Sequence, residues 1–203
     1  MIRLFHMPTI RSLRVIWLME EMGIAYELVP VSLGPHGLEH PDFARYNPLN
    51  TVPTLVDGDV VMTESGAMVS YLMTKYGPTE LALAADHRDY PAYLHWQWFC
   101  EASLAEHIVT YRLHTEFLPP DHRSETARDQ ASKDIQKRLQ EAERRFGAQS
   151  WAVADQVTAA DIFLGHACHA VVGLREGPAL PQNLQRYYQR LMDRPAFARA
   201  TRC

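Results

Sequence analysis

Every pattern in this chain that is typical of a β-strand lies within the first 76 of its 203 residues. The opening segment IRLFH reads as a short strand, and residues 11–22 follow with apolar side chains at helical spacing and Gly23 placed to end the helix. The segment AYELVPVS then reads as a second strand. A strand, a crossover helix and a second strand form a parallel pair, so the sequence predicts a β-α-β unit at the start of the chain.

A hairpin is predicted at residues 54–62, where TLVDGDVVM reads as two strands joined at Asp57-Gly58. An Asp-Gly pair between apolar runs is a strong hairpin signal and adds an antiparallel edge to the sheet. A helix is expected over 65–76, ended by Gly77-Pro78, and HPDFARYNP holds only a short helical turn. Residues 1–80 are therefore predicted to form an α/β domain with a mixed four-stranded sheet flanked by helices.

Residues 81–203 carry helical patterns only. Helices are expected over 89–117 and 122–146, from near Thr158, and over 182–192 before Pro195. This half is therefore predicted to be an all-α helical bundle, and the domain boundary is expected between residues 80 and 81.

Composition and charge argue against several classes of function. The chain is 47% hydrophobic, has a formal net charge of -4 and contains no long basic run, which gives no support to a nucleic-acid partner. No apolar stretch approaches the ~20 residues needed to span a bilayer, so no membrane partner is expected. The opening MIRLF is too short for the apolar core of a signal peptide, and a cytoplasmic location is expected.

The cysteines and histidines predict no metal centre. Cys100, Cys168 and Cys203 are widely spaced and form no C-x-x-C motif, so neither a dithiol redox centre nor a zinc ribbon is predicted. His166 and His169 lie three residues apart in HACH, but a metal site needs three or four converging ligands and the neighbouring residues do not supply the others.

Three short segments of the first half carry groups that suit a ligand site: Pro8-Thr9, Val52-Pro53 and Glu64-Ser65. Taken singly, Thr9 and Ser65 are more simply interpreted as helix caps and Pro53 as an edge-strand proline. In the predicted domain, however, the first and third helices begin on the same side of the sheet, so their N-termini and positive dipole ends face one cleft. A proline that enters its strand in cis would leave the preceding backbone groups to pair with an extended peptide.

A peptide with a carboxylate at one end and a thiol in the middle would fit such a cleft. The Ser65 hydroxyl would bind the carboxylate, and the Thr9 hydroxyl would donate to the thiolate. A hydrogen-bond donor and a helix N-terminus both favour the ionised sulfur and lower the pKa of the thiol. The reactive sulfur would then belong to the ligand and not to the protein.

The segments RVIWLMEEMGIAYELVPV, PDFARYNPLNTVPTLVDGDVVMTESGAMVSYL and VTAADIFLG, in this order and spacing, resemble the cytosolic glutathione transferases over essentially the whole chain. The resemblance implies a thioredoxin-like N-terminal domain, an all-helical C-terminal domain, a homodimer and a role in detoxification with glutathione as co-substrate. It also implies that Val52 and Pro53, with Pro53 in cis, hold the cysteinyl backbone of glutathione. Glu64 and Ser65 would bind the γ-glutamyl end.

Two further motifs are interpreted as structural. Thr158 and Asp161 resemble the helix-capping box of the family, with Thr158 as the cap and Asp161 three residues on. Arg14 is interpreted as a partner in an ion pair rather than as a ligand.

The chain departs from the family pattern where the sulfur would be bound. Many bacterial relatives carry a serine where this chain has Ile10, and the cysteine of other members would stand near Arg11. Some bacterial relatives use a threonine after proline, as in Pro8-Thr9. The candidates to contact the sulfur are therefore, in order, Thr9, Arg11 and Ser12.

The chain also departs from the pattern at the glycyl end of glutathione. Thr51 stands where a basic residue is usual, and Leu38 stands where a ligand of the glycyl carboxylate is expected. Thr51 and His40 are taken as the substrate-binding candidates there, with His36 as a further residue that could compensate.

The leading hypothesis is a glutathione transferase that ionises glutathione and adds its thiolate to an electrophilic, apolar substrate. That substrate would bind between the domains against a set of largely aromatic side chains, of which at least some must be core: Met7, Trp96, Phe99, Tyr111, His114 and Phe117. A glutathione-dependent disulfide or peroxide reductase is the alternative within enzymes. A non-catalytic, transferase-like binding or interaction protein is the alternative outside them, which the departures at Ile10, Thr51 and Leu38 keep open.

Overall fold

The computed structural model describes residues 1–34, 37–40 and 43–203, and His36 lies outside this range. The chain forms two compact units, of which unit 1 comprises residues 1–82 and 194–203 and unit 2 comprises residues 83–193. This division differs from the expected one in two respects. The boundary lies between residues 82 and 83 instead of 80 and 81, and the last residues of the chain pack with the first unit.

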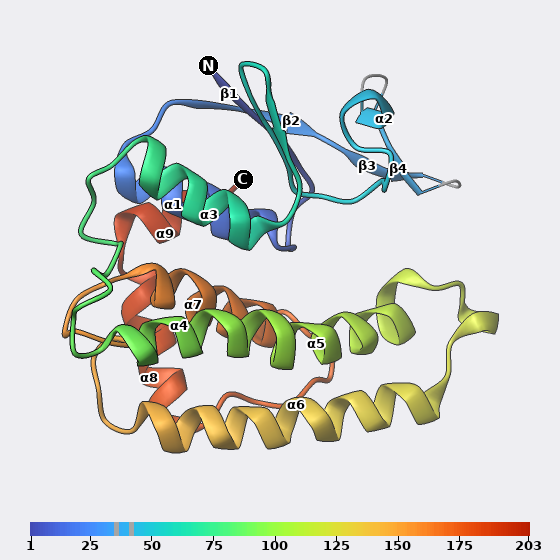
Figure 1. Cartoon of the computed structure of the whole chain (residues 1–203). Coiled ribbons are helices and arrows are strands. Elements are labelled where there is room, and N and C mark those ends of the chain that lie inside the picture. Colours follow the sequence, from blue (N-terminus) through green and yellow to red (C-terminus); the bar gives the residue numbers. More distant parts are fainter. Residues whose placement is uncertain (35–36, 41–42) are drawn as a thin grey trace. The chain divides into compact units, whose positions relative to one another are not determined.

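Unit 1 is built on a four-stranded sheet with the strand order β2-β1-β5-β6 (Figure 1). The central strand β1 (Ile2–His6) pairs in parallel with β2 (Tyr26–Pro30) and antiparallel with β5 (Thr54–Asp57). β5 in turn forms a hairpin with β6 (Val60–Met62), turning at Gly58 with φ of 62°, a conformation that glycine adopts without a steric penalty. The predicted mixed sheet with an antiparallel edge is confirmed.

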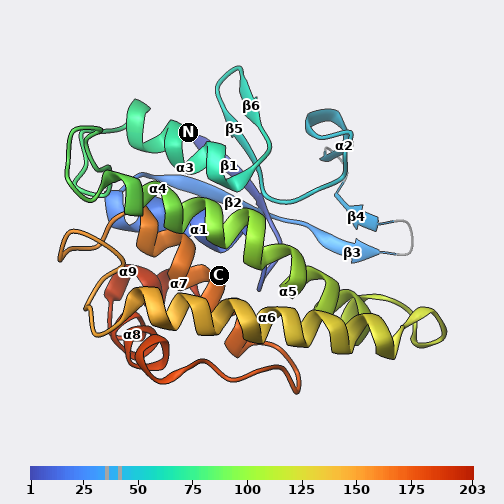
Figure 2. The ribbon, with the colours of Figure 1, turned by 60° about the horizontal axis from the view of Figure 1, so that its bottom comes forward.

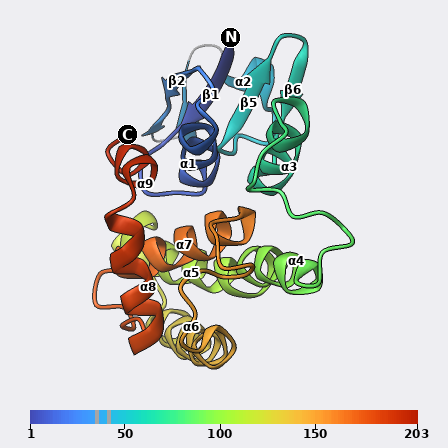
Figure 3. The ribbon, with the colours of Figure 1, turned by 90° about the vertical axis from the view of Figure 1, so that its left-hand side faces the viewer.

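Helices α1 (Ser12–Met22) and α3 (Ser65–Lys75) lie side by side on one face of this sheet (Figure 3). α1 is also covered by α9 (Pro195–Ala200), a short helix near the end of the chain. The rings of Phe197 and Trp17 meet edge to face there, with their centroids 4.6 Å apart. Arg194 forms an ion pair with Glu21 and strengthens this contact. The sequence does not predict α9, because a segment this short has little helical stability of its own and depends on its packing against α1.

The opposite face of the sheet packs on α2 (Phe43–Tyr46). Side chains alternate along a strand, so Phe5 points to this face and its ring lies 5.4 Å from the Phe43 ring. On the same side, Arg3 donates a hydrogen bond of 2.8 Å to the Tyr46 hydroxyl. His6 points the other way, toward α1, where it meets Ser12.

The strand expected over AYELVPVS is divided in two. β2 ends at Pro30, which has no N–H to donate to a ladder, and β3 (Ser32–Gly34) pairs instead with β4 (Gly37–Glu39) in a separate two-stranded sheet. The sequence did not predict this two-stranded sheet, because each of its strands is only three residues long. It forms one wall of the candidate site.

Unit 2 is helical apart from one isolated bridge between Val153 and Gln156. The segment expected over 89–117 alternates α-helical and π-helical turns, and α5 packs along the long helix α6 (Figure 2). The predicted helical bundle is thus confirmed, with these elements: α4 (Tyr90–Trp98), the π-helical η1 (Phe99–Leu104), α5 (Ala105–Arg112), the π-helical η2 (Leu113–Phe117), the 3-10 turn η3 (Pro120–His122), α6 (Glu125–Phe146), α7 (Ala159–Val172) and α8 (Gln182–Met192). Within the described residues, no helix combines the length and the apolar character needed to cross a membrane.

Candidate functional site

The turn between β1 and α1 carries the first two candidates for contact with the sulfur. Thr9 is exposed and has φ of 67°, in the left-handed region that a β-branched residue rarely adopts. Arg11 is half-buried and occupies the N-cap of α1. Sparsely populated backbone conformations of this kind cluster at functional sites, so the turn is a candidate on its geometry alone.

Ser12, the third candidate, is placed differently. Its side chain is completely buried, and its Oγ donates to the Met7 carbonyl at 3.1 Å. The same Oγ lies 2.7 Å from Nδ1 of His6, which is buried as well. The Ser12 hydroxyl is therefore used within the fold, whereas Thr9 and Arg11 are accessible from outside.

The start of α3 carries the Glu64-Ser65 pair. Glu64 is exposed and has φ of 66°, and Ser65 is buried as the first residue of the helix. The guanidinium of Arg14, which is also completely buried, donates from Nη1 to Ser65 Oγ at 3.2 Å. This bond joins the first turns of α1 and α3, as expected from helices that begin on the same side of the sheet. Because Ser65 Oγ accepts from Arg14, its own hydrogen is available to donate to a ligand.

This arrangement suits a zwitterionic ligand group. The first N–H groups of α3 have no partner within the helix, and the helix dipole places partial positive charge there. The buried charge of Arg14 lies directly behind Ser65 and adds to that field. The exposed carboxylate of Glu64 precedes the helix and can accept from an ammonium group. A ligand with a carboxylate at Ser65 and an ammonium at Glu64 would satisfy both the donors at the start of α3 and the Glu64 carboxylate.

The loop that enters β5 carries Val52 and Pro53. Their peptide bond is cis, as the resemblance implies, and the Val52 side chain packs against the core cluster around Phe5. The preceding Thr51 is held by a buried amide, since Asn47 Nδ2 donates to Thr51 O at 2.7 Å and to Thr51 Oγ1 at 3.0 Å. The backbone position of this loop therefore depends on Asn47.

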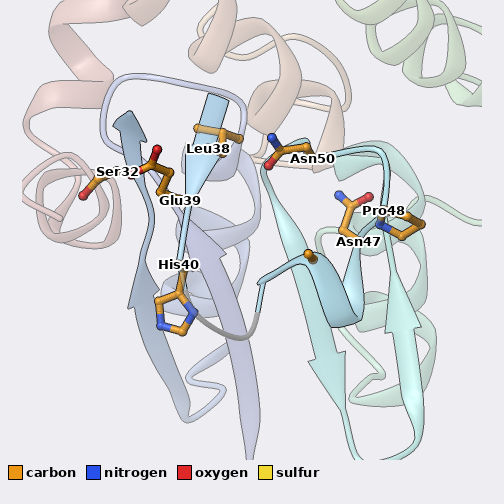
Figure 4. Close-up of a pocket in the computed structure, with 8 residues that line it drawn as sticks. Ser32, Leu38, Glu39, His40, Asn47, Pro48 and Asn50 are labelled. Carbon is orange, nitrogen blue, oxygen red and sulfur yellow. The ribbon is translucent and has the colours of Figure 1, made fainter. Parts of the chain in front are cut away.

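An open cavity of about 660 Å³ lies between β4 and the segment that follows α2 (Figure 4). His40 lies on the β4 side and is half-buried. Its ring packs edge to face with the Phe5 ring, and the two ring centroids are 5.4 Å apart. Asn47 and Asn50 stand on the other side. The residues that line the cavity are Ser32, Leu38, Glu39, His40, Ala44, Asn47, Pro48 and Asn50.

At one end of this cavity, the Asn50 side chain is hydrogen-bonded to the backbone of β4. In the amide orientation that satisfies both groups, Asn50 Nδ2 donates to Leu38 O at 2.9 Å and Oδ1 accepts from Leu38 N at 3.3 Å. Gly37 is required beside this contact, because it has φ of 111° and a Cβ there would stand 2.6 Å from the Asn50 side-chain amide. The Leu38 side chain packs against the Phe5 cluster, so Leu38 serves the fold where the family pattern expects a ligand.

Sequence reasoning did not identify Asn47, Asn50 or His6 as residues that shape the site. A signal did exist for the two asparagines, because the run NPLN is typical of a turn and Asn side chains there often bind nearby backbone. The position of His6, at the end of the strand IRLFH, carried no such signal. Its partner was not predictable, because the hydrogen bond to Ser12 exists only once the turn is formed.

Unit 2 places several expected residues in its core. Trp96 is buried and donates from Nε1 to Ala152 O at 3.1 Å, and Tyr111 is buried and donates to Arg175 O at 2.8 Å. Cys100 and Cys168 are buried too, and burial raises the pKa of the Cys168 thiol. Across residues 1–34, 37–40 and 43–203, no three His, Cys, Asp or Glu side chains are grouped as metal ligands.

Comparison with known proteins matches both halves of the chain to one family. Residues 1–74 match the family model of the glutathione S-transferase N-terminal domain, and residues 103–195 match that of the C-terminal domain. A zeta class glutathione S-transferase of Euphorbia esula is 31% identical over 166 residues, which cover 79% of this chain and 71% of the relative.

Two further similarities cover nearly the whole chain. The disulfide-bond oxidoreductase YfcG of Escherichia coli is 26% identical over 207 residues, covering 98% of this chain and 94% of the relative. The crystal structure of a theta class glutathione S-transferase from Xanthomonas axonopodis pv. citri, with glutathione bound, superposes with a TM-score of 0.84 at 27% identity. It covers 100% of this chain and 97% of its own.

Proposed function

Because this chain belongs to the glutathione S-transferase family, we propose that it binds glutathione in unit 1 and adds the glutathione thiolate to an electrophilic carbon of an apolar substrate. The observation that carries the proposal is the junction of α1 and α3, where Arg14 donates to Ser65 at the start of one helix and the exposed Thr9 precedes the start of the other. The carboxylate end and the central thiol of an anionic peptide both find donors there.

In the proposed complex the γ-glutamyl end of glutathione binds at the start of α3. Its carboxylate accepts from the Ser65 hydroxyl and from the first N–H groups of the helix, and its ammonium faces the Glu64 carboxylate. The cysteinyl backbone pairs with Val52. The glycyl end extends toward His40 and the cavity that it lines, with Thr51 as the neighbouring polar residue.

The thiol loses its proton to solvent on binding, and the resulting thiolate accepts a hydrogen bond from the Thr9 hydroxyl. Arg11 contributes positive charge at the same helix terminus. Burial of Ser12 and the use of its hydroxyl by Met7 support Thr9 over Ser12 as the donor to sulfur. The sulfur then attacks the electrophile, a C–S bond forms, and the leaving group departs with its electron pair. Catalysis consists of proximity and stabilisation of the thiolate.

A second candidate function is glutathione-dependent reduction of disulfides. It is favoured by the similarity to a disulfide-bond oxidoreductase over almost the entire chain. In that reaction one bound glutathione attacks a substrate disulfide and a second glutathione resolves the mixed disulfide. A protein thiol is then not needed, which agrees with the absence of cysteine from the Met7–Arg11 turn.

The test separates these functions from a non-catalytic binding protein. Isothermal titration with glutathione measures binding, and turnover with 1-chloro-2,4-dinitrobenzene and with 2-hydroxyethyl disulfide measures the two reactions. Transferase turnover supports the leading proposal, and turnover of the disulfide alone favours the reductase. Binding without either reaction would leave a binding protein, and no binding at millimolar glutathione would overturn the proposal as a whole.

The proposed enzyme is a cytoplasmic homodimer, as its family implies. The exposed apolar residues Val61 of β6 and Trp98 of α4, which are 44% and 67% exposed, are available to be covered in such an assembly. Light scattering should give a mass twice the 23.2 kDa of one chain at micromolar concentration. A single-chain mass under those conditions would contradict the dimer.

A further inference from the structure

Two buried polar side chains, those of His6 and Ser12, lie on the inner side of the turn that carries Thr9. His6 ends β1 and is 6% exposed, and Ser12 begins α1 and is 0% exposed. His6 Nδ1 and Ser12 Oγ lie 2.7 Å apart, and Ser12 Oγ donates to the Met7 carbonyl at 3.1 Å. The chain of hydrogen bonds therefore runs from the strand to the helix and back to Met7, the first residue of the turn.

We infer where the hydrogens of this chain lie from its donors and acceptors. A serine hydroxyl has one hydrogen, and here it is given to the Met7 carbonyl. The short contact with His6 then requires that the imidazole donates, so the hydrogen of the neutral ring is on Nδ1. Burial lowers the pKa of His6, while the backbone of Cys203 acts in the opposite sense. The neutral form with hydrogen on Nδ1 is the form that this contact selects.

We propose that His6 and Ser12 are positioning residues for thiolate stabilisation, because they fix the Met7 carbonyl and thereby the adjacent Pro8-Thr9 segment. Neither side chain can touch glutathione from its buried position, so both act through Thr9. This inference rests on the proposed function, and within it on Thr9 as the donor to the sulfur.

The conformation of Thr9 explains why such a support is needed. A threonine with φ of 67° is held in a sparsely populated region, and such conformations persist only where the surrounding structure over-determines them. The inner side of the turn supplies a constraint of this kind. The bond from Ser12 to the Met7 carbonyl is such a constraint, and His6 orients the serine that makes it.

The first experiment titrates the thiolate absorbance of bound glutathione against pH in single variants. In Ser12→Ala we expect the pKa of the bound thiol to rise and kcat/KM at pH 7 to fall about tenfold, since small misplacements of a catalytic group have effects of this order or larger. The loss of kcat/KM should be smaller at a pH above the raised pKa, where the bound thiol is ionised in the variant as well. Affinity for glutathione should change less than about threefold, because the γ-glutamyl and backbone contacts remain.

Two comparisons separate positioning from a general loss of structure. Ser70→Ala is the matched control, because Ser70 is exposed on α3 and donates only to the Gly66 carbonyl of its own helix. At position 6, His6→Asn keeps a donor close to the place of Nδ1, whereas His6→Phe removes it. The asparagine variant should retain most of kcat/KM and the phenylalanine variant should behave as Ser12→Ala does.

A second readout does not depend on glutathione. Nitrogen-15 shifts of the His6 ring in the ligand-free protein should show the hydrogen on Nδ1, and Ser12→Ala should move it toward Nε2. If glutathione binds to the wild type and Thr9→Val raises the thiol pKa but Ser12→Ala does not, the inference is wrong and the proposed function stands. A hydrogen on Nε2 in the wild type would also overturn it, whereas failure of the wild type to bind glutathione would remove both proposals.

Discussion

At the scale of single residues, two strained backbone positions mark the candidate site. Thr9 and Glu64 both have φ near 66°, although neither is a glycine. Glu64 directly precedes α3, and Thr9 lies three residues before the start of α1. Such a conformation costs about 1–3 kcal/mol per residue. Both residues are exposed, so relief of strain by burial of their side chains does not account for their conformation. We propose that a role toward a ligand accounts for it.

Thr9→Val tests the first of these positions. The substitution keeps the shape of the side chain and removes the donor to the thiolate, a charge-assisted hydrogen bond worth about 1.5–3 kcal/mol. The pKa of the bound thiol should rise by about one to two units, and kcat/KM at pH 7 should fall roughly ten- to a hundredfold. Glutathione affinity should change less. The readouts are thiolate absorbance against pH and steady-state kinetics, and an unchanged thiol pKa would move the role to Arg11, since the Ser12 hydroxyl is buried and used by Met7.

Ser65→Ala tests the second helix start. It removes the hydroxyl that would donate to the γ-glutamyl carboxylate and leaves Arg14 in place behind it. Loss of one charge-assisted bond should weaken glutathione binding by about ten- to a hundredfold, as measured by isothermal titration. Ser70→Ala, on the exposed side of the same helix, should bind as the wild type does. Equal affinities in wild type and Ser65→Ala would show that the ligand orientation is wrong.

At the scale of elements, the start of α7 shows how one carboxylate can secure a helix. The capping box expected from the sequence is present, with Thr158 as cap and Asp161 bonded to its backbone N–H at 2.9 Å. The structure adds two long-range partners, since Asp161 Oδ1 also accepts from Ala152 N at 2.9 Å and from the Tyr187 hydroxyl at 3.1 Å. Asp161 therefore joins α7 to the preceding loop and to α8.

Asp161→Asn should destabilise unit 2. Burial raises the pKa of Asp161 to about 6, so the carboxylate is ionised at neutral pH and accepts on both oxygens. An asparagine amide would place its NH₂ against a buried donor, which leaves groups unsatisfied at a cost of about 1–3 kcal/mol each. We expect a lower urea midpoint at pH 7 with an unchanged m-value. Asp86→Asn, at an exposed position, is the control, and equal midpoints for Asp161→Asn and wild type would contradict this account.

At the scale of the whole molecule, stability should depend on pH through histidines that are buried or half-buried. Burial lowers the pKa of His169, as it does that of His6. A histidine whose folded pKa is below its unfolded value of about 6.5 binds its proton more readily in the unfolded chain, so stability is lost as pH falls through this range. The raised pKa of Asp161 acts in the opposite sense between about pH 4 and 6, and this contribution is common to wild type and histidine variants.

His169→Asn isolates one of these contributions. Asparagine keeps a polar atom near Nδ1, which lies 2.9 Å from the Tyr188 hydroxyl, and does not titrate. We expect the free energy of unfolding of the wild type to fall on acidification below about pH 6.5 and the fall to be shallower in the variant. Urea titrations at several pH values measure this, and parallel curves would refute it.

Local patterns in the sequence were sufficient to identify most elements and to single out the three segments of the candidate site. Strand and helix periods, the Asp57-Gly58 hairpin and the Thr158 cap depend on residues close together in the chain, so their geometry can be read without knowing the fold. Thr9, Val52-Pro53 and Glu64-Ser65 were recognised for the same reason. Their convergence followed from the rule that parallel β-α-β units place helix starts at one edge of a sheet.

The tertiary structure alone decided the features that depend on contacts between distant residues. The helix α9 packs on α1 with Phe197 against Trp17, and the bond from Arg14 to Ser65 spans 51 residues of sequence. The sequence set which residues could be donors, acceptors and core side chains. Which of them are buried was decided by folding, and burial is what commits the Ser12 hydroxyl to Met7 and leaves Thr9 exposed for a ligand. The physical reason is that a buried polar group must be satisfied within the protein, and its partner is known only once the chain has closed around it.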